Sequence, residues 1–103
     1  MDLVDQVLTA TKNLPRNEFE LRRQMNGAAI SIPSNVAEGW KRTRRRGAYQ
    51  NHISIAMGSH AELDTQLEIC FRNALLNPAD CKTLVALVGR VDAVLSHLHD
   101  ALD

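Results

Sequence analysis

Residues 21–40 read LRRQMNGAAISIPSNVAEGW, a stretch whose apolar residues recur every three or four positions. On a helical wheel these residues fall within one sector of ~120°, the width of a face that packs against a core. They are Leu21, Met25, Ala28, Ala29, Ile32, Val36 and Trp40. The pattern predicts an amphipathic helix over residues 17–40, kinked at Pro33, which removes one backbone hydrogen bond. Asn17 and Glu20 have the spacing of a capping box at its start.

The remaining chain repeats this spacing and does not show the strict alternation of apolar and polar residues that marks strands. The spacing predicts three further helices, over residues 2–14, 45–76 and 78–102. Short connections between such helices favour antiparallel neighbours. We therefore expect an all-α fold, an antiparallel up-down four-helix bundle. Residues 1–103 are expected to form a single domain, since this length suffices for one core.

Residues that start or stop helices stand at the predicted boundaries. Pro15 ends the first helix, because proline disfavours helical geometry in the residue before it. Thr43 is placed to cap the third helix. Asn77-Pro78 starts the fourth, since asparagine is a good cap and proline suits the first helical position. These signals support four separate helices.

The third predicted helix carries apolar residues on two sides. Its main face consists of Tyr49, Ile53, Ala56, Met57, His60, Leu67, Phe71, Ala74 and Leu75. A second sector, nearly opposite, carries Ile55, Gly58 and Ile69, which is unexpected for a helix with one solvated side. We therefore expect something outside this helix to cover the second sector.

Charged residues are unevenly distributed, although the formal net charge is zero. Residues 16–46 hold eight Lys and Arg against three acids, whereas residues 47–103 hold three against seven. Five of the cations cluster between the second and third helices, at Lys41, Arg42, Arg44, Arg45 and Arg46. Such a cluster can contact several phosphates of RNA or DNA. A solvated turn is the alternative interpretation.

Two aromatic residues flank this cluster, Trp40 and Tyr49. Aromatic rings beside cations can stack on nucleic-acid bases. Trp40, however, lies in the core-facing sector of its helix, so we expect it to pack in the core. The aromatic residues therefore add little to the nucleic-acid hypothesis.

The side chains that could carry chemistry lie close together on the third helix. His60 and Asp64 are one turn apart, as two metal ligands would be, but no third ligand has matching spacing. We expect them to form a hydrogen-bonded core pair. Ser59 completes the residue types of a nucleophilic triad, yet one helix offers neither a strand-to-helix turn nor oxyanion donors. The sequence therefore predicts no catalytic residue, no metal site, no cofactor and no enzymatic activity.

Cys70 and Cys81 are the only cysteines. We expect two buried thiols, with a disulfide between them as the alternative. No apolar run approaches the ~20 residues of a membrane span or resembles the apolar region of a signal peptide. These features predict a cytoplasmic protein without membrane contact.

Three segments resemble a bacterial family of four-helix bundles first described as proteins encoded in 23S rRNA intervening sequences. That family also includes the accessory protein of diversity-generating retroelements. The segments are LRRQM with AAISIPSNVAEG at residues 21–25 and 28–39, IAMGS at residues 55–59, and AELDTQL at residues 61–67. The resemblance implies a cyclic homopentamer without a catalytic centre. Together with the second apolar sector of the third helix, it predicts a homo-oligomer whose interface includes Ile55 and Ile69. In the retroelement branch it also implies a basic surface that binds nucleic acid and a reverse transcriptase.

The resemblance assigns structural roles to particular residues. Gly58 and Ser59 look like the family's Gly-Ser pair, where small side chains permit close helix packing. Three polar residues resemble a recurring hydrogen-bond network between helices or subunits, namely Asn35, Glu38 and Glu62. After Gly39 we expect the chain to loosen. There it departs from the family pattern, because Gly47-Ala48-Tyr49 replaces the usual acidic residue ahead of an aromatic.

Two functional classes follow from these patterns. The first is a non-enzymatic, pentameric bundle that binds RNA or DNA through the basic cluster as an accessory protein, with a reverse transcriptase as a candidate partner. The second is a structural or protein-interaction scaffold without nucleic-acid binding. Binding to RNA or DNA separates the two.

Overall fold

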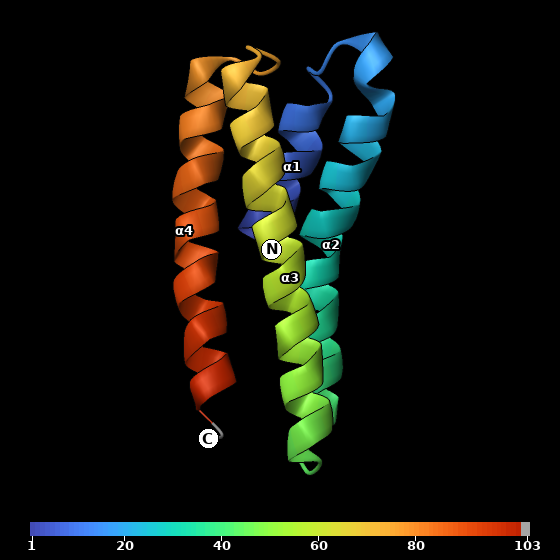
Figure 1. The fold of residues 1–103 in the computed structure, drawn as a ribbon, viewed down its shortest axis with the longest axis vertical. Coiled ribbons are helices and arrows are strands. Elements are labelled where there is room, and N and C mark those ends of the chain that lie inside the picture. Colours follow the sequence, from blue (N-terminus) through green and yellow to red (C-terminus); the bar gives the residue numbers. More distant parts are fainter. Residues whose placement is uncertain (102–103) are drawn as a thin grey trace.

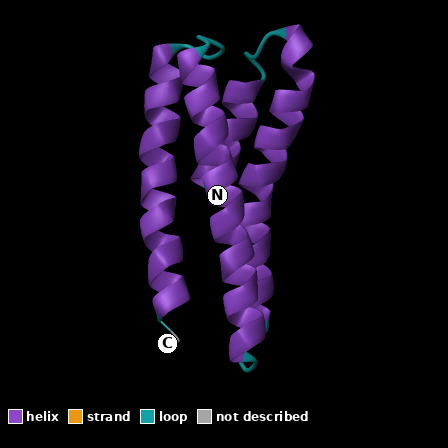
Figure 2. Ribbon diagram, viewed as in Figure 1, coloured by secondary structure: helices purple, strands orange, loops and turns teal. Residues whose placement is uncertain are grey.

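The computed structural model describes residues 1–101, which form four α-helices and one 3-10 turn, with no strand in this part of the chain (Figure 1, Figure 2). The elements are α1 (Asp2–Thr11), η1 (Arg16–Glu18), α2 (Phe19–Lys41), α3 (Arg46–Arg72) and α4 (Pro78–Asp100). Consecutive helices run in opposite directions (Figure 1). This arrangement confirms the all-α, up-down four-helix bundle. The predicted end of the last helix, at residue 102, lies outside the described residues.

The four helices surround one core but differ greatly in length. α1 and α3 each contact both α2 and α4, and the bundle measures 44 × 21 × 19 Å. At 1.5 Å per residue, α3 is about 40 Å long, whereas α1 is only about 15 Å long. α1 begins about half-way along the bundle (Figure 1). The end that carries the α2–α3 connection is therefore built from α2, α3 and α4 alone.

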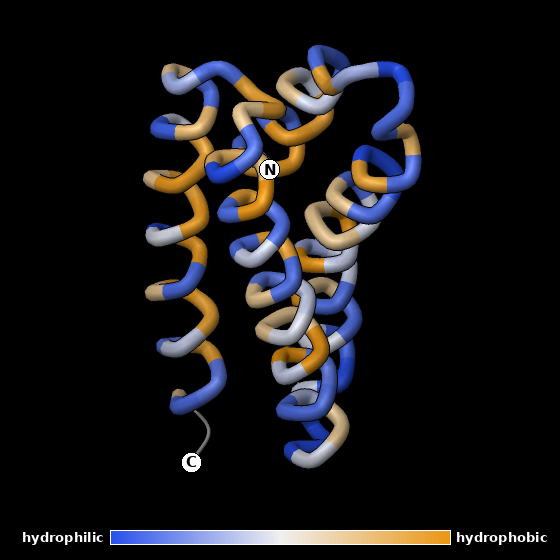
Figure 3. Tube along the Cα trace, turned by 45° about the horizontal axis from the view of Figure 1, so that its top comes forward, coloured by the Kyte–Doolittle hydropathy of each residue, from blue (hydrophilic) through white to orange (hydrophobic). Residues whose placement is uncertain are grey.

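Apolar side chains from all four helices fill the core. The largest fully buried ones are Val7, Met25, Ile53, Leu63, Leu67, Leu84 and Leu95. Figure 3 shows the pattern on α4, whose hydrophobic residues face the other helices while its hydrophilic residues face outward. Burial of apolar surface, worth roughly 25 cal/mol per Å², is the main force that holds such helices together.

The predicted start of α4 is correct. Asn77 caps this helix, because its Oδ1 accepts a hydrogen bond of 2.8 Å from the backbone N–H of Asp80. Pro78 occupies the first turn, where its missing N–H has no intrahelical partner to lose. Sequence and structure agree here because all the signals lie within four consecutive residues.

The predicted caps of α2 and α3 are wrong. Asn17 lies within η1, so α2 begins at Phe19, and no side chain caps it. Thr43 does not cap α3 either, because Arg45, two residues further on, holds the cap position without a side-chain hydrogen bond. α2 then runs through Pro33 without interruption.

α1 and α3 end earlier than the spacing predicts. α1 ends at Thr11, and the next three residues turn the chain while keeping Leu14 buried. α3 ends at Arg72 because Ala74 adopts a left-handed backbone conformation, with φ of 52°. The Leu75 N–H then donates to the Cys70 carbonyl at 2.9 Å, which closes a Schellman-type helix end.

Candidate functional site

Five exposed cations occupy the α2–α3 connection, at the lower end of the bundle in Figure 1. We call this set the basic turn: Lys41, Arg42, Arg44, Arg45 and Arg46. Arg42 lies 3.6 Å from Glu38 in an ion pair whose side chains are about half exposed. Within residues 1–101, no acid lies at ion-pair distance from the other four. The basic turn therefore presents largely uncompensated positive charge to solvent.

Part of the basic turn opposes the dipole of α3. Arg45 caps this helix and Arg46 is its first residue, so positive charge lies at the positive end of the helix. The first turn of α3 contains no acid to compensate. Charge at a helix end typically changes stability by ~0.3–1 kcal/mol. These arginines consequently do not stabilise α3 through its dipole.

Trp40, directly before the basic turn, is 71% exposed, so its predicted place in the core is wrong. At 100° per residue, Trp40 lies about 80° from Ile32 on the helical wheel, at the edge of the apolar sector. Gly39 is only about 20° from Ile32 by the same count, and it is buried. α1 does not extend to this end of the bundle, so it does not cover the indole ring.

Tyr49, the other aromatic residue near the basic turn, is buried, with 4% of its surface exposed. Its hydroxyl donates a hydrogen bond of 2.9 Å to the backbone carbonyl of Leu98 on α4. Tyr49 thus ties the start of α3 to the end of α4. It is not available for stacking on a base.

Gly39 lies where α2 and α3 approach closely. A Cβ atom at this position would lie 3.3 Å from the Cβ of His52 and 3.4 Å from the carbonyl oxygen of Tyr49. The prediction that the chain loosens at Gly39 is therefore wrong, because α2 continues to Lys41. The glycine sets the spacing of the two helices that carry the basic turn.

A chain of polar contacts joins α2 to α3 above this glycine. The Ser59 hydroxyl donates to the Ser31 hydroxyl oxygen at 2.7 Å, and the Asn35 amide donates to the same oxygen at 3.0 Å. The Asn35 Oδ1 lies 3.1 Å from Nδ1 of His52. Asn35 and Ser59 are therefore joined through the Ser31 hydroxyl, and His52 extends the network from α3. The sequence pattern singles out neither Ser31 nor His52. Only the four-residue spacing of Ser31 and Asn35 on α2 signals their contact.

The two glutamates expected in this network lie outside it. Glu38 pairs with Arg42 on its own helix. Glu62 is exposed and accepts a 3.2 Å hydrogen bond from Gln66, one turn further along α3. The Oε1 atom of Gln66 is buried and has no hydrogen-bond partner within the described chain. The prediction that these glutamates join helices of one chain is thus wrong for both of them.

Four of the predicted interface residues form an exposed stripe along α3. We call it the α3 stripe: Ile55, Gly58, Glu62 and Ile69. They lie within about 60° on the helical wheel, and Ile55 and Ile69 are 44% and 42% exposed. A Cβ atom on Gly58 would meet nothing within 4 Å. The prediction of close packing at Gly58 is therefore wrong for helices within one chain. A role of Gly58 between subunits stays a prediction.

His60 and Asp64 do not form the expected core pair. The His60 Nε2 lies 2.7 Å from the carbonyl oxygen of Val88, so this ring joins α3 to α4. Asp64 is exposed. No group of three His, Cys, Asp or Glu side chains within residues 1–101 could hold a metal ion. His60 is thus a structural residue.

Both cysteines are buried and free, which excludes the disulfide alternative. Burial, with smaller contributions from Cys81 and Glu18, raises the pKa of the Cys70 thiol to about 11. Burial also raises the pKa of the Cys81 thiol. Because the thiolate is the nucleophilic form, neither cysteine is activated for chemistry.

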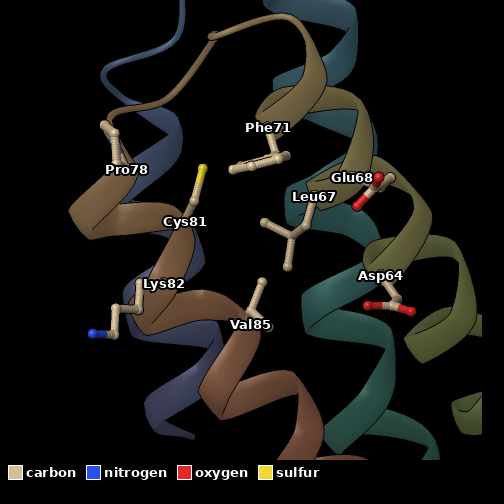
Figure 4. A pocket seen from close by; sticks show the side chains of 8 residues that line it. All are labelled: Asp64, Leu67, Glu68, Phe71, Pro78, Cys81, Lys82 and Val85. Atoms are coloured by element: carbon tan, nitrogen blue, oxygen red, sulfur yellow. The ribbon is translucent and has the colours of Figure 1, made fainter.

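An open groove of about 380 Å³ lies between α3 and α4 near their connection (Figure 4). Its lining is Asp64, Leu67, Glu68, Phe71, Pro78, Cys81, Lys82 and Val85. In Figure 4 the side chains of Leu67, Phe71 and Val85 converge on the hollow, while Lys82 points away from it. Glu68 is paired with Arg72 at 2.8 Å. The groove offers apolar surface for a contact and no arrangement for a reaction.

No helix within the described residues is long and apolar enough to cross a membrane. The model of one protein family, described as 23S rRNA-intervening sequence protein, matches residues 1–97. The matched region includes the basic turn and the whole α3 stripe. No curated protein matches this chain.

Proposed function

This chain belongs to the 23S rRNA-intervening sequence protein family, and we propose that it is a non-enzymatic homo-oligomer that binds nucleic acid through the basic turn. The observation that carries this proposal is the concentration of five exposed cations at one end of the bundle, of which one, Arg42, is paired with an acid within residues 1–101. Each phosphate contact that such cations make releases condensed counterions, which drives binding.

The position of the basic turn supports an anionic ligand. Arg45 and Arg46 add positive charge to a helix end that is already positive. A phosphate group bound there would interact favourably both with the arginines and with the free N–H groups of the first turn of α3. A charge distribution that is unfavourable in the free protein becomes favourable in the complex.

The α3 stripe supports the homo-oligomer. Two large aliphatic side chains are exposed on this stripe around a glycine that has open space above it. Such a surface suits close packing against another subunit, and the family resemblance implies five subunits in a ring. A ring would repeat the basic turn in every subunit and strengthen the local electrostatic field. A reverse transcriptase remains a proposed partner.

Replacement of Arg44, Arg45 and Arg46 by glutamine tests the nucleic-acid function. Fluorescence anisotropy with labelled RNA and DNA, from low to physiological salt, should show weaker binding by the triple variant. The slope of log affinity against log salt should fall by roughly 0.7–0.9 for each phosphate that the variant no longer neutralises. Helix content and oligomer mass should stay unchanged.

A matched control removes three exposed cations elsewhere, by changing Lys12, Lys82 and Arg90 to glutamine. This variant loses the same net charge and should bind nearly as tightly as the wild type. Equal losses of affinity in both variants would mean that binding depends on the net charge of the protein and not on the basic turn. If the wild type binds neither RNA nor DNA at low salt, the scaffold function is preferred.

Light scattering coupled to gel filtration tests the assembly. The chain has a mass of 11.5 kDa, so five subunits differ clearly from one or two. A monomer at micromolar concentration would overturn the ring and leave the α3 stripe without its proposed partner.

A further inference from the structure

Trp40 is the one tryptophan of the chain, and its indole is 71% exposed directly before the basic turn. Burial of a large apolar side chain stabilises the folded state, and most of this gain is absent for Trp40. No hydrogen bond or ion pair within the described chain involves its side chain. Packing within the bundle therefore does not explain a tryptophan here.

Two cations of the basic turn directly follow Trp40 in the sequence, and one of them, Arg42, also pairs with Glu38. Both cations are exposed. The close approach at Gly39 and the bond from Tyr49 to α4 hold this end of the bundle in place. A flat π face next to cations suits a ligand that offers a base and a phosphate together.

Only unpaired nucleotides offer such a ligand. In a duplex each base is stacked between its neighbours, and its face is not accessible to a side chain. Single strands, loops and bulges expose base faces, which proteins bind by stacking aromatic rings on them. The cations alone would bind duplex and single strands through phosphates, whereas the indole adds affinity only for unpaired bases.

We propose that Trp40 is a stacking platform for an unpaired base and that the basic turn therefore prefers single-stranded nucleic acid over duplex. This inference rests on the proposed nucleic-acid function and adds the class of ligand. It assigns Trp40 to direct contact with the base and the arginines to contact with phosphates. Every base has a π face, so little sequence preference is expected.

The fluorescence of the single tryptophan reports on Trp40 alone. Titration with an unstructured 20-nucleotide oligo(U) or oligo(dT) should quench this fluorescence, and a fully paired duplex of equal length should quench it much less. Replacing Trp40 with leucine should weaken single-strand binding about tenfold, because the variant loses the aromatic face on which one base stacks. Trp40→Phe should restore part of the loss, because phenylalanine keeps an aromatic face.

Phe19 provides a matched control. It is 63% exposed, begins α2 at the opposite end of the bundle and lies far from the basic turn along this helix. Phe19→Leu should leave the ratio of single-strand to duplex affinity unchanged. In Trp40→Leu this ratio should fall toward one.

The outcomes separate the two proposals. If Trp40→Leu keeps the wild-type ratio while the triple arginine variant loses binding, the basic turn stands and the stacking platform is overturned. If wild-type protein binds neither strand form at low salt, both proposals fall. If Trp40→Leu lowers the oligomer mass, Trp40 is a subunit contact and the stacking assignment is overturned.

Discussion

The hydroxyl oxygens of Ser31 on α2 and Ser59 on α3 lie 2.7 Å apart, and this contact begins the polar chain that continues to Asn35 and His52. It crosses the interface of the two helices that carry the basic turn. The hydroxyls and the amide satisfy one another in a partly buried place, where an unmade hydrogen bond would be costly. These hydrogen bonds therefore fix how α2 and α3 are aligned along their length.

Ser59→Ala should lower the free energy of unfolding by about 1 kcal/mol, because the variant cannot form this hydrogen bond between the helices. Ser31→Ala should cost more, since Ser31 accepts from both Ser59 and Asn35. Chemical denaturation measures both effects, and Ser54→Ala, at an exposed position on α3, is the control. The double variant should be less destabilised than the sum of the two single changes. Additive effects would show that the two hydroxyls do not interact.

Gly39→Val should destabilise the protein by about 1–3 kcal/mol, because its side chain must enter the close contact with His52 and Tyr49. The same substitution at Gly27, which has open space around it, should be neutral or slightly stabilising. The midpoints of urea unfolding compare the two variants. Equal midpoints would mean that α2 and α3 can separate at Gly39 without cost.

The helices were predictable because their pattern is repeated many times along the chain. An apolar residue at every third or fourth position over 20 residues leaves little alternative to a helix. The surroundings of individual side chains at the helix ends were not predictable in this way. Trp40 lies at the edge of the apolar sector on the helical wheel, about 80° from Ile32, yet its side chain is exposed. The shortness of α1, which leaves that side uncovered, affects Trp40 from a distant part of the sequence.

The candidate site was predictable where it depends on neighbouring residues in the chain. The basic turn is visible in the sequence because its cations are nearly consecutive. The partner of Asn35, in contrast, is His52 from another helix, and that pairing depends on how far α3 is shifted along α2. The hydrogen-bond partner of His60 is likewise the carbonyl of Val88 on α4, not Asp64 on its own helix. Such contacts require the three-dimensional alignment of the helices.

Gly58→Leu should leave helix content unchanged and lower the oligomer mass. The glycine has open space around it within the chain, so a leucine fits the isolated bundle and favours the helix. On a close subunit contact the same side chain would cause overlap. Circular dichroism and light scattering measure the two properties, with Gly89→Leu on α4 as the control. An unchanged mass would remove the α3 stripe from the assembly.

Ala74→Gly should stabilise the protein by about 0.5–1 kcal/mol. Ala74 has a φ of 52°, a conformation that costs an alanine ~1–2 kcal/mol and a glycine almost nothing. The greater freedom of glycine in the unfolded chain offsets part of this gain. Ala79→Gly, in the first turn of α4, should instead destabilise. Thermal unfolding distinguishes the two variants, and a loss of stability in Ala74→Gly would contradict the left-handed helix end.

Cys70 should make the protein less stable at alkaline pH. Its thiol is fully buried beside Met25, with the two sulfur atoms 3.8 Å apart, and burial raises its pKa from 9.0 to about 11. The unfolded chain therefore loses this proton first as the pH rises. The contribution of the neutral thiol to stability is complete below pH 9 and is lost between about pH 9 and 11.

At one unit of pKa per 1.36 kcal/mol, the loss reaches about 2 kcal/mol by pH 11. Cys70→Ala removes this titration but creates a small cavity, so it should be the less stable protein at pH 7. Between pH 8 and 10.5 the difference in the free energy of unfolding between wild type and variant should narrow, because only the wild type loses stability as Cys70 ionises in the unfolded chain. Denaturant unfolding under reducing conditions measures the gap at each pH. A gap that stays constant would show that the thiol reaches solvent in the folded bundle.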